Sequence, residues 1–434
     1  AYARYGVLPF FLLLALVVWA WARRTLGELG GAAAVALVVC NPNVVAHAGL
    51  ATTDVACAAT ITLSLFAALW WIDRPSTGRS ILFGIALGLA VGSRLSAIAF
   101  IAVAVVACYA VRGFVGRTWR LSPSSDTRAS VVSMAAVTMT SALCLWALYR
   151  FAVGPMHGSP IVVPAPAFVD GVKTFLLHGS TGHPTFLLGT PSNRGWWYYF
   201  PVALAVKTPL PLMILAIVGA VVAVRNARVG RDWIGLVPLV SALAMLAVSM
   251  MVRVDLGVRL VLPLYPLFAI LGAQGALELW RSRHASIARP TLAVLTAATL
   301  WIPVRSYPDW LAYFNPLAGR HPEHVLVDSN LDWGQDLYRL RNTIVAAGIT
   351  DSVYVAYFGT ADLAAAGVPH ARLLGLHEHR RGWIAASETF LAGEWVGTAY
   401  QWLYLFTPVA RIGPSMILWH IPEPPPATKD SSQR

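Results

Sequence analysis

Asp328-Ser-Asn-Leu-Asp-Trp-Gly-Gln-Asp-Leu337 divides the chain into two parts of different composition. About 300 residues dominated by long apolar runs precede this stretch, and a region of ordinary soluble composition follows it. Because an apolar run of about 20 residues crosses the hydrocarbon of a bilayer as a helix, the first part reads as membrane helices. The sequence therefore predicts a mainly α fold: a polytopic membrane helix bundle with a small C-terminal α/β domain.

The composition fits this fold class and excludes several functions. Of the 434 residues, 57% are hydrophobic and only 12% are charged, which is about half the charged fraction of a typical soluble domain. The net charge of +12 does not indicate a nucleic-acid partner, because the basic residues lie in short loops between apolar runs. All four cysteines fall inside apolar runs, so neither a disulfide framework nor a zinc site is predicted.

About ten membrane spans are predicted from the apolar runs. They cover residues 5–22, 31–48, 53–72, 80–92, 94–111, 130–150, 200–224, 234–251, 258–279 and 290–305. A loop at residues 151–199 separates the sixth span from the seventh and ends in the aromatic cluster Trp196-Trp-Tyr-Tyr-Phe200. Such a cluster is typical of a membrane interface, where amphipathic rings lie at headgroup level.

Basic residues set the predicted orientation. Alternate loops carry fourteen of them: Arg23, Arg24, Arg74, Arg79, Arg112, Arg117, Arg120, Arg128, Arg225, Arg228, Arg231, Arg281, Arg283 and Arg289. The opposite loops and helix ends carry only five: Arg4, Arg150, Lys173, Arg194 and Arg253. The positive-inside rule places the first set in the cytoplasm, so the loop at 151–199 and the chain after about residue 305 are predicted to face outward.

Three regions follow from this reading. Residues 1–305 form the membrane bundle, residues 306–421 form an extracytoplasmic α/β domain, and residues 422–434 form a disordered tail. Within the α/β domain, an amphipathic helix is expected at residues 333–347 and ends at Gly348. Short strands are expected at residues 325–327, 352–357, 384–386 and 415–419.

Charged residues near a membrane are costly and therefore mark candidate sites. Those at the predicted outer ends of spans are one carboxylate, Asp54, and the cations Arg94, Lys207, Arg253 and Arg259. A carboxylate and several cations on one face suit a reaction between a phosphate-bearing lipid and a hydroxyl or an amine. The cations neutralise the leaving phosphate, and Asp54 accepts or orients a proton. A carrier more often places such charges near the midplane.

Simpler roles remain open for the same residues. Asp54 could serve only as a helix N-cap, since Asp accepts hydrogen bonds from free N–H groups of a first turn. Arg94, Lys207 and Arg259 could extend along the helices to lipid headgroups. Arg253 has a loop position that offers an easy role in solvent.

The polar stretch at 328–337 has its own alternatives. The spacing of Asp328, Asn330 and Asp332 resembles a calcium loop, but Trp333 stands where such loops need glycine. No metal site is therefore assigned, and a divalent metal has no support in the sequence. The stretch is expected to be structural: Asp332 or a neighbour caps the following helix, Trp333 is buried beneath it, and Asp336 pairs with Arg339 or Arg341.

Several motifs resemble those of phospholipid carrier-dependent glycosyltransferases, the superfamily of protein O-mannosyltransferases and lipid A aminoarabinose transferases. Their glycine-rich helix usually carries Lys where this chain has Arg94. The matching segments are Asn41-Pro42 with His47-Ala-Gly-Leu-Ala-Thr-Thr-Asp54, Gly84-Ile-Ala-Leu-Gly88 with Ser93-Arg94-Leu-Ser96, Trp196-Trp-Tyr-Tyr-Phe-Pro201 with Lys207-Thr-Pro209, Gly257-Val-Arg259 with Leu262-Pro-Leu-Tyr-Pro266, Tyr313-Phe-Asn-Pro316, and the stretch at 328–337.

The resemblance implies a C-type membrane glycosyltransferase fold and transfer of a sugar from a polyprenyl-phosphate donor. The acceptor would be a protein, a lipid or a cell-wall glycan at the outer face of a bacterial-type cytoplasmic membrane. Asp54 is the candidate catalytic residue, expected to line the sugar-transfer cavity and to orient the substrate or the catalytic loop, and His47, Arg94, Lys207, Arg253 and Arg259 are the expected substrate-binding residues. Beyond the lipid-linked sugar, the acceptor and membrane lipids, no cofactor or nucleic acid is expected.

Members of this superfamily begin with a further membrane helix and a long outer loop that bears an acidic motif, taken to hold the catalytic base. This chain starts at Ala1, close to the helix that follows that loop, so the helix and loop are expected to be missing from it. A lipid-linked sugar transporter or a catalytically silent membrane scaffold is the alternative function. The outer placement of the charges, the lack of an evident internal repeat and the α/β domain favour an enzyme.

Overall fold

The computed structural model describes residues 2–117 and 127–425. The chain forms two compact units, each built from several segments. Unit 1 consists of Ala1–Thr181, Thr208–Val252 and Leu260–Trp310, and unit 2 of Gly182–Lys207, Arg253–Arg259 and Leu311–Arg434. Unit 2 therefore combines the predicted C-terminal domain with two segments from earlier in the chain.

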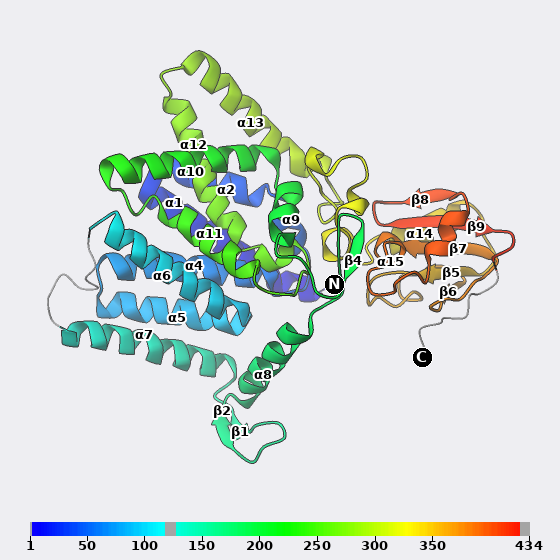
Figure 1. The fold of residues 1–434 in the computed structure, drawn as a ribbon, viewed down its shortest axis with the longest axis horizontal. Helices are drawn as coiled ribbons and strands as arrows, with labels where there is room; N and C mark the ends of the chain where they lie inside the picture. Colours follow the sequence, from blue (N-terminus) through cyan, green and yellow to red (C-terminus); the bar gives the residue numbers. More distant parts are fainter. Residues whose placement is uncertain (1, 118–126, 426–434) are drawn as a thin grey trace. The chain divides into compact units, whose positions relative to one another are not determined.

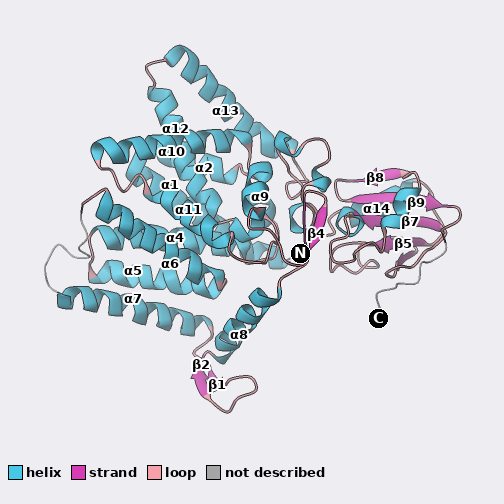
Figure 2. Ribbon diagram, viewed as in Figure 1, coloured by secondary structure: helices cyan, strands magenta, loops and turns pink. Residues whose placement is uncertain are grey.

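Unit 1 is almost entirely helical (Figures 1 and 2). Its elements are η1 (Tyr2–Val7), α1 (Leu8–Leu26), α2 (Glu28–Val39), α3 (Pro42–Ala48), α4 (Asp54–Asp73), α5 (Thr77–Ser93), α6 (Ser96–Phe114), α7 (Thr127–Leu148), the hairpin of β1 (Val153–Pro155) and β2 (Val162–Pro164), α8 (Pro166–Thr181), α10 (Leu210–Gly230), α11 (Val237–Ser249), α12 (Leu264–Arg281) and α13 (Ala285–Arg305). Large apolar side chains such as Leu16, Val106 and Met139 are exposed on these helices, as expected for surfaces that face lipid.

Fewer helices meet the requirements of a membrane span than the ten predicted. Six are long and apolar enough within the described residues, and seven if a bent pair of helices counts as one span. The bent pair is α2 and α3, which meet at 67°. The bend follows from Pro42, which has no N–H to continue α2, while the Asn41 side chain caps α3 by accepting from the Asn43 N–H at 2.9 Å. The helices α5 and α11 are apolar but shorter. The chain is a multi-pass membrane protein.

Small residues allow close packing inside unit 1. The helices α10 and α12 touch at Gly219 and Gly275, where an added Cβ would collide with the carbonyl oxygens of Leu271 and Leu215, respectively. Such contacts are common between membrane helices, because small residues let the backbones approach and gain van der Waals contact. The helix α4 is the most enclosed of the candidate spans, since 89% of the residues in its most apolar 18-residue stretch are buried. It packs against α1, α5 and α6.

Unit 2 carries the only sheet of more than two strands in the described part of the chain. The strand order is β6-β5-β7-β9-β8; β5 is parallel to β6 and β7, whereas β9 is antiparallel to β7 and β8. The strands are β5 (Val353–Ala356), β6 (Ala371–Leu373), β7 (Gly382–Ser387), β8 (Ala410–Ile412) and β9 (Met416–Ile421). The remaining elements are the hairpin of β3 (Thr185–Leu187) and β4 (Thr190–Ser192), α9 (Tyr199–Lys207), η2 (Val258–Val261, which runs on into unit 1), η3 (Pro316–Ala318), η4 (Pro322–His324), η5 (Asp328–Asn330), α14 (Leu337–Ala346), α15 (Glu388–Leu391) and η6 (Gln401–Leu405).

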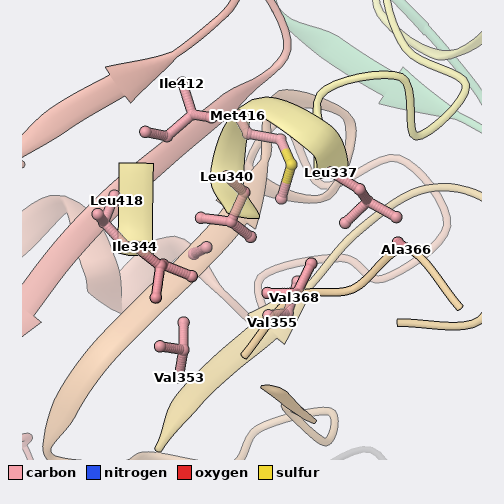
Figure 3. Packing of buried hydrophobic residues seen from close by; sticks show 11 residues of the cluster. Leu337, Leu340, Ile344, Val353, Val355, Ala366, Val368, Ile412, Met416 and Leu418 are labelled. Atoms are coloured by element: carbon pink, nitrogen blue, oxygen red, sulfur yellow. The ribbon is translucent and has the colours of Figure 1, made fainter. Parts of the chain in front are cut away.

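Two cores form on the opposite faces of this sheet because successive strand residues alternate between faces. Val353 and Val355 face α14 and pack with Leu340 and Ile344, as Figure 3 shows. Strand residues that point to the opposite face of the sheet, among them Ile384 and Trp419, pack with Leu391 of α15 and Leu403 of η6. A third cluster of Phe186, Val327 and Leu331 joins β3 to the polar stretch.

Several local predictions are confirmed and others are wrong. Strands occur at three of the four predicted places, whereas residues 325–327 form a short connection between η4 and η5. This connection makes a single bond to the hairpin, from the Leu188 N–H to the Val325 carbonyl. The predicted helix begins at Leu337 rather than at residue 333. Of the predicted disordered tail, residues 426–434 lie outside the described residues.

Candidate functional site

Asp54 and Arg94 form an ion pair in unit 1, in which the Asp54 side chain is fully buried and the Arg94 side chain is 22% exposed. Asp54 is the first residue of α4 and is 1% exposed, and Arg94 directly follows the end of α5. The Arg94 Nη1 donates to Asp54 Oδ1 at 2.9 Å, and the Thr52 Oγ1 donates to Asp54 Oδ2 at 2.8 Å. The residue at the N-cap of α4 is Thr53, so the N-cap alternative for Asp54 is wrong. The sequence predicted both charges at the outer ends of membrane spans, and the structure places them in direct contact.

His47 lies on α3, the second helix of the bent pair, and is 1% exposed. Its Nδ1 is 2.8 Å from the Asn43 carbonyl oxygen, one turn earlier in the same helix. This bond orients the imidazole, because a ring nitrogen that faces a carbonyl must carry the proton. A role of His47 in substrate binding stays a prediction.

Lys207, the last residue of α9, is completely buried in unit 2. Its ammonium group donates to the carbonyl oxygens of Leu311 and Asn330, each at 2.7 Å, and lies 4.3 Å from the centre of the Phe314 ring. The alternative that Lys207 extends to lipid headgroups is therefore wrong, because its ammonium group bonds to backbone inside the protein. These contacts give Lys207 a structural role, and binding of a donor phosphate by Lys207 stays a prediction.

Arg259 and Arg253 belong to the short segment Arg253–Arg259 of unit 2. The Arg259 guanidinium stacks 4.6 Å from the centre of the Trp333 ring, and Arg253 is exposed. Between them, Asp255 accepts a hydrogen bond from the Trp196 N–H at 2.9 Å, and its burial raises its pKa to about 6. Arg94 lies in the other unit, so a cavity shared by Arg94, Lys207 and Arg259 stays a prediction.

Asn330 explains why the polar stretch matters for unit 2. Its side-chain oxygen accepts from the Val258 N–H at 3.1 Å, and its amide nitrogen donates to the Tyr199 hydroxyl at 3.1 Å. The position beside it requires glycine, because a Cβ at Gly257 would lie only 2.9 Å from that oxygen and would collide with it. With the bond from Lys207 to its backbone carbonyl, Asn330 ties together the three segments of unit 2. A calcium-loop role does not account for these contacts.

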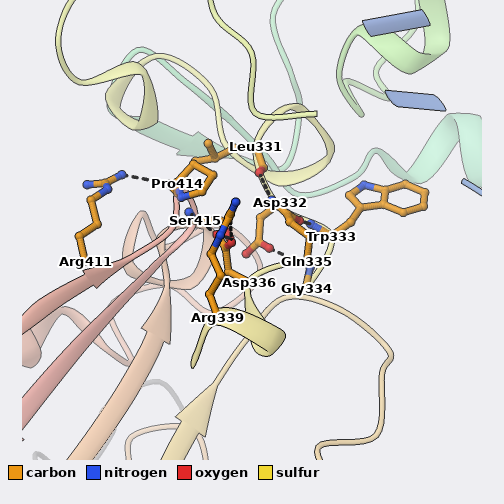
Figure 4. Close-up of polar contacts among 10 residues, drawn as sticks. All are labelled: Leu331, Asp332, Trp333, Gly334, Gln335, Asp336, Arg339, Arg411, Pro414 and Ser415. Atoms are coloured by element: carbon orange, nitrogen blue, oxygen red, sulfur yellow. Dashed lines mark hydrogen bonds and ion pairs between the residues drawn. The ribbon is translucent and has the colours of Figure 1, made fainter. Parts of the chain in front are cut away.

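The carboxylates of Asp332 and Asp336 are buried, and Figure 4 shows Asp336 beside Ser415, the residue before strand β9. Asp336 Oδ2 accepts from the Ser415 N–H at 2.9 Å and the Ser415 hydroxyl at 2.8 Å, and Oδ1 accepts from Arg339. The predicted pair of Asp336 with Arg339 is confirmed. Asp332 Oδ1 accepts from the Gly334 N–H at 2.8 Å, and burial raises the pKa of Asp332 to about 7.

Two details of this stretch differ from the prediction. Among the described contacts, no side chain caps the first turn of α14, because Asp332 and Asp336 bond to other groups. Trp333 is half-buried rather than enclosed beneath the helix, and Figure 4 shows its ring pointing away from Asp336. The spacing of the acidic residues alone could not reveal that Ser415, 79 residues later in the chain, would bond to Asp336.

Sequence reasoning missed a second set of buried acids in unit 2. Burial raises the pKa of Glu388 to about 7, although Arg411 lies 3.0 Å from it and opposes this shift. Burial and then the charge of Asp328 raise the pKa of Glu394 to about 10. The signal in the sequence was weak: Glu388 follows a short apolar strand and Glu394 lies in Gly-Glu-Trp-Val-Gly, and neither pattern is specific. Within the described residues, no group of three or more His, Cys, Asp or Glu is arranged to hold a metal.

Comparisons with known proteins give one family match. Residues 4–146 match the model of the dolichyl-phosphate-mannose-protein mannosyltransferase family. This segment contains His47, Asp54 and Arg94. None of the curated proteins matches the chain.

Solved structures of two kinds of membrane protein are similar at low identity. ArnT from Cupriavidus metallidurans, in the apo state, is 16% identical; the match covers 96% of this chain and 83% of that chain, with a TM-score of 0.46. The same protein bound to undecaprenyl phosphate gives the same identity and coverage and a TM-score of 0.43. The oligosaccharyltransferase of Archaeoglobus fulgidus, tethered to an acceptor peptide, is 12% identical over 90% of this chain and 59% of that chain, with a TM-score of 0.38. The family match confirms, over residues 4–146, the predicted resemblance to the phospholipid carrier-dependent glycosyltransferases.

Proposed function

We propose that this protein transfers a sugar from a polyprenyl-phosphate donor to an acceptor at the outer face of a cytoplasmic membrane. The observation that carries the proposal is the ion pair between the buried Asp54 and the partly exposed Arg94, inside the segment that matches the mannosyltransferase family. An ion pair that is largely withdrawn from water is costly in a membrane protein, and such residues commonly mark a substrate site.

The chemistry is a substitution at the anomeric carbon of the sugar. The acceptor oxygen or nitrogen forms a bond to that carbon while the bond from the carbon to the phosphate oxygen breaks. The acceptor proton passes to a carboxylate, and the polyprenyl phosphate leaves with the electron pair. Arg94 stabilises the negative charge that develops on the phosphate, and Asp54 orients or accepts the proton.

The remaining candidate residues fit this scheme in different ways. Arg259 and Arg253 lie on one short segment of unit 2 and provide positive charge that attracts the anionic lipid-linked donor. Lys207 supports the same segment indirectly, since it holds Asn330, which binds the Val258 N–H. His47 is fixed by the Asn43 carbonyl and adds a polar contact for the sugar.

A transfer assay separates this function from transport of a lipid-linked sugar. Membranes that contain the protein are incubated with polyprenyl phosphates labelled in the sugar, and the products are separated into lipid, glycan and protein fractions. The proposal expects label that is covalently attached to an acceptor and an equal amount of released polyprenyl phosphate. Movement of intact labelled donor across the bilayer, without a new glycosidic product, would identify a transporter instead.

A further inference from the structure

Two cavities of unit 2 have Trp395 in both of their linings. The first has a volume of about 410 Å³ and is lined mainly by the aromatic rings of Trp333, Tyr357, Phe358, Phe390 and Trp395. The second has a volume of about 270 Å³ and has polar walls that include Ser192, Asn193 and Glu394. An aromatic cavity and a polar cavity are therefore neighbours that share the residue Trp395.

Trp395 has an unusual backbone conformation for a large residue. Its φ is +72°, in the left-handed region that bulky side chains rarely adopt, and its side chain is 46% exposed. Such conformations persist only where the surrounding structure imposes them, and they gather at ligand sites. Gly393 and Gly397, also at positive φ, flank it, so the short loop holds the ring at the surface.

Neighbouring rings fix the position of the indole. The His183 ring meets it edge-on at 4.5 Å between centroids, and the Phe358 ring lies 6.2 Å away. Gly334 and Gly359 pack against the Tyr357 ring of the same cavity, where a Cβ at Gly359 would lie 3.0 Å from that ring. The aromatic walls are thus preformed rather than dependent on a ligand.

The polar groups at these cavities indicate the class of ligand. The Trp333 indole N–H is buried and has no hydrogen-bond partner among the described residues, and the Thr360 hydroxyl lies at the exposed rim of the aromatic cavity. Of the described residues that line the two cavities, none is a lysine or an arginine, and the guanidinium of Arg259 is already stacked on the Trp333 ring. Burial and then the charge of Asp328 raise the pKa of Glu394 to about 10, so the wall of the polar cavity contains a carboxyl group that is neutral at neutral pH and bonded to Asp328.

A neutral sugar ring matches this combination. It has an apolar face of C–H groups that stacks on an aromatic ring and hydroxyl groups at its edge that both donate and accept hydrogen bonds. We propose that the two cavities on either side of Trp395 form a binding site for a neutral saccharide, with one sugar ring on the aromatic side and the next toward Asn193 and Glu394. This inference rests on the proposed function and names the acceptor of that reaction as a glycan.

Binding of neutral disaccharides to the full chain in phosphatidylcholine nanodiscs tests this site without any donor or turnover. Glycoside detergents must be absent, because their headgroups are sugars. Saturation-transfer NMR is recorded with mannobiose, maltose, lactose and diacetylchitobiose, and with decanol and an uncharged hydrophobic tripeptide as competitors. We expect at least one disaccharide to bind, and Trp395→Gly to weaken that binding at least about tenfold.

The glycine variant keeps the test independent of folding. Glycine adopts the positive φ at position 395 without strain, which offsets part of the packing lost with the ring, and the melting temperature of Trp395→Gly is measured beside its binding to show that unit 2 stays folded. Tyr404→Ala, which removes another exposed aromatic ring of unit 2 that lines neither cavity, should leave binding unchanged. The inference is overturned if no disaccharide binds, if Trp395→Gly binds as tightly as the parent, or if only decanol or the tripeptide occupies the site. Any of these results leaves the transfer assay, and hence the proposed function, to be decided separately.

Discussion

At the scale of single residues, burial decides what each predicted charge does. Asp54 and Arg94 neutralise each other, whereas Lys207 donates to two backbone carbonyl groups that lie 104 and 123 residues further along the chain. The sequence marks such residues as costly, because a charge at a membrane needs compensation. It does not name the compensating group, since the partner of Lys207 is backbone and every residue has a backbone carbonyl.

Lys207→Met should destabilise unit 2, because it leaves the carbonyl groups of Leu311 and Asn330 buried without a donor. Each such group costs about 1–3 kcal/mol. Thermal unfolding and limited proteolysis of the purified protein measure the effect. Lys173→Met, at a side chain that is 50% exposed, is the matched control and should change little. Equal melting temperatures for the Lys207 and Lys173 variants would contradict the structural role of Lys207.

At the scale of elements, the longest apolar segments and the strand–helix alternation of the C-terminal region could be predicted. Each predicted span is at least partly helical in the structure, because an apolar run of this length has few other solutions in lipid. Residues 325–327 were predicted as a strand from their apolar side chains, which instead fill the cluster with Phe186. None of the described strands pairs with these residues, so they do not form a strand. Short apolar runs do not distinguish a strand from a buried connection.

The turn before α14 gives unit 2 a dependence on pH. The pKa of Asp332 is raised to about 7 in the folded protein, mainly by burial, so the folded state retains a proton that the unfolded chain releases near pH 4. The stabilisation of unit 2 by the protonated Asp332 is complete below pH 4 and is lost as the pH rises through about 7. Each unit of pKa shift corresponds to about 1.4 kcal/mol. Glu388, whose pKa is also raised to about 7, acts in the same direction.

Asp332→Asn should therefore reduce the fall in melting temperature between pH 5 and pH 8, because asparagine cannot ionise. Melting curves of the parent protein and the variant at both pH values test this. Asp351→Asn, at an exposed position of the same unit, is the control and should preserve the full fall. If the Asp332 variant shows the same pH dependence as the parent, the buried acid does not control the stability of unit 2.

At the scale of the whole molecule, the proposed topology places unit 2 and the Asp54 end of α4 outside the cytoplasm. A single cysteine at the exposed position Thr350, in a chain without its four native cysteines, should react with a membrane-impermeant maleimide in intact cells. A cysteine in place of Val229, which is 83% exposed in a predicted cytoplasmic loop, should react only after the membrane is opened. The reverse pattern would invert the topology and move the proposed reaction to the other face.

Transfer by Asp54→Asn tests the central claim most directly. The assay uses the intact native protein with labelled polyprenyl-phosphate sugars, and Asp73→Asn, at the other end of the same helix, as the matched control. We predict that Asp54→Asn lowers turnover at least about tenfold, equivalent to about 1.4 kcal/mol of transition-state stabilisation. The control should retain the parent rate, and both variants should be present in the membrane at the parent level. Turnover of Asp54→Asn equal to that of the parent, at equal protein level, would contradict a role of the Asp54 and Arg94 pair in sugar transfer.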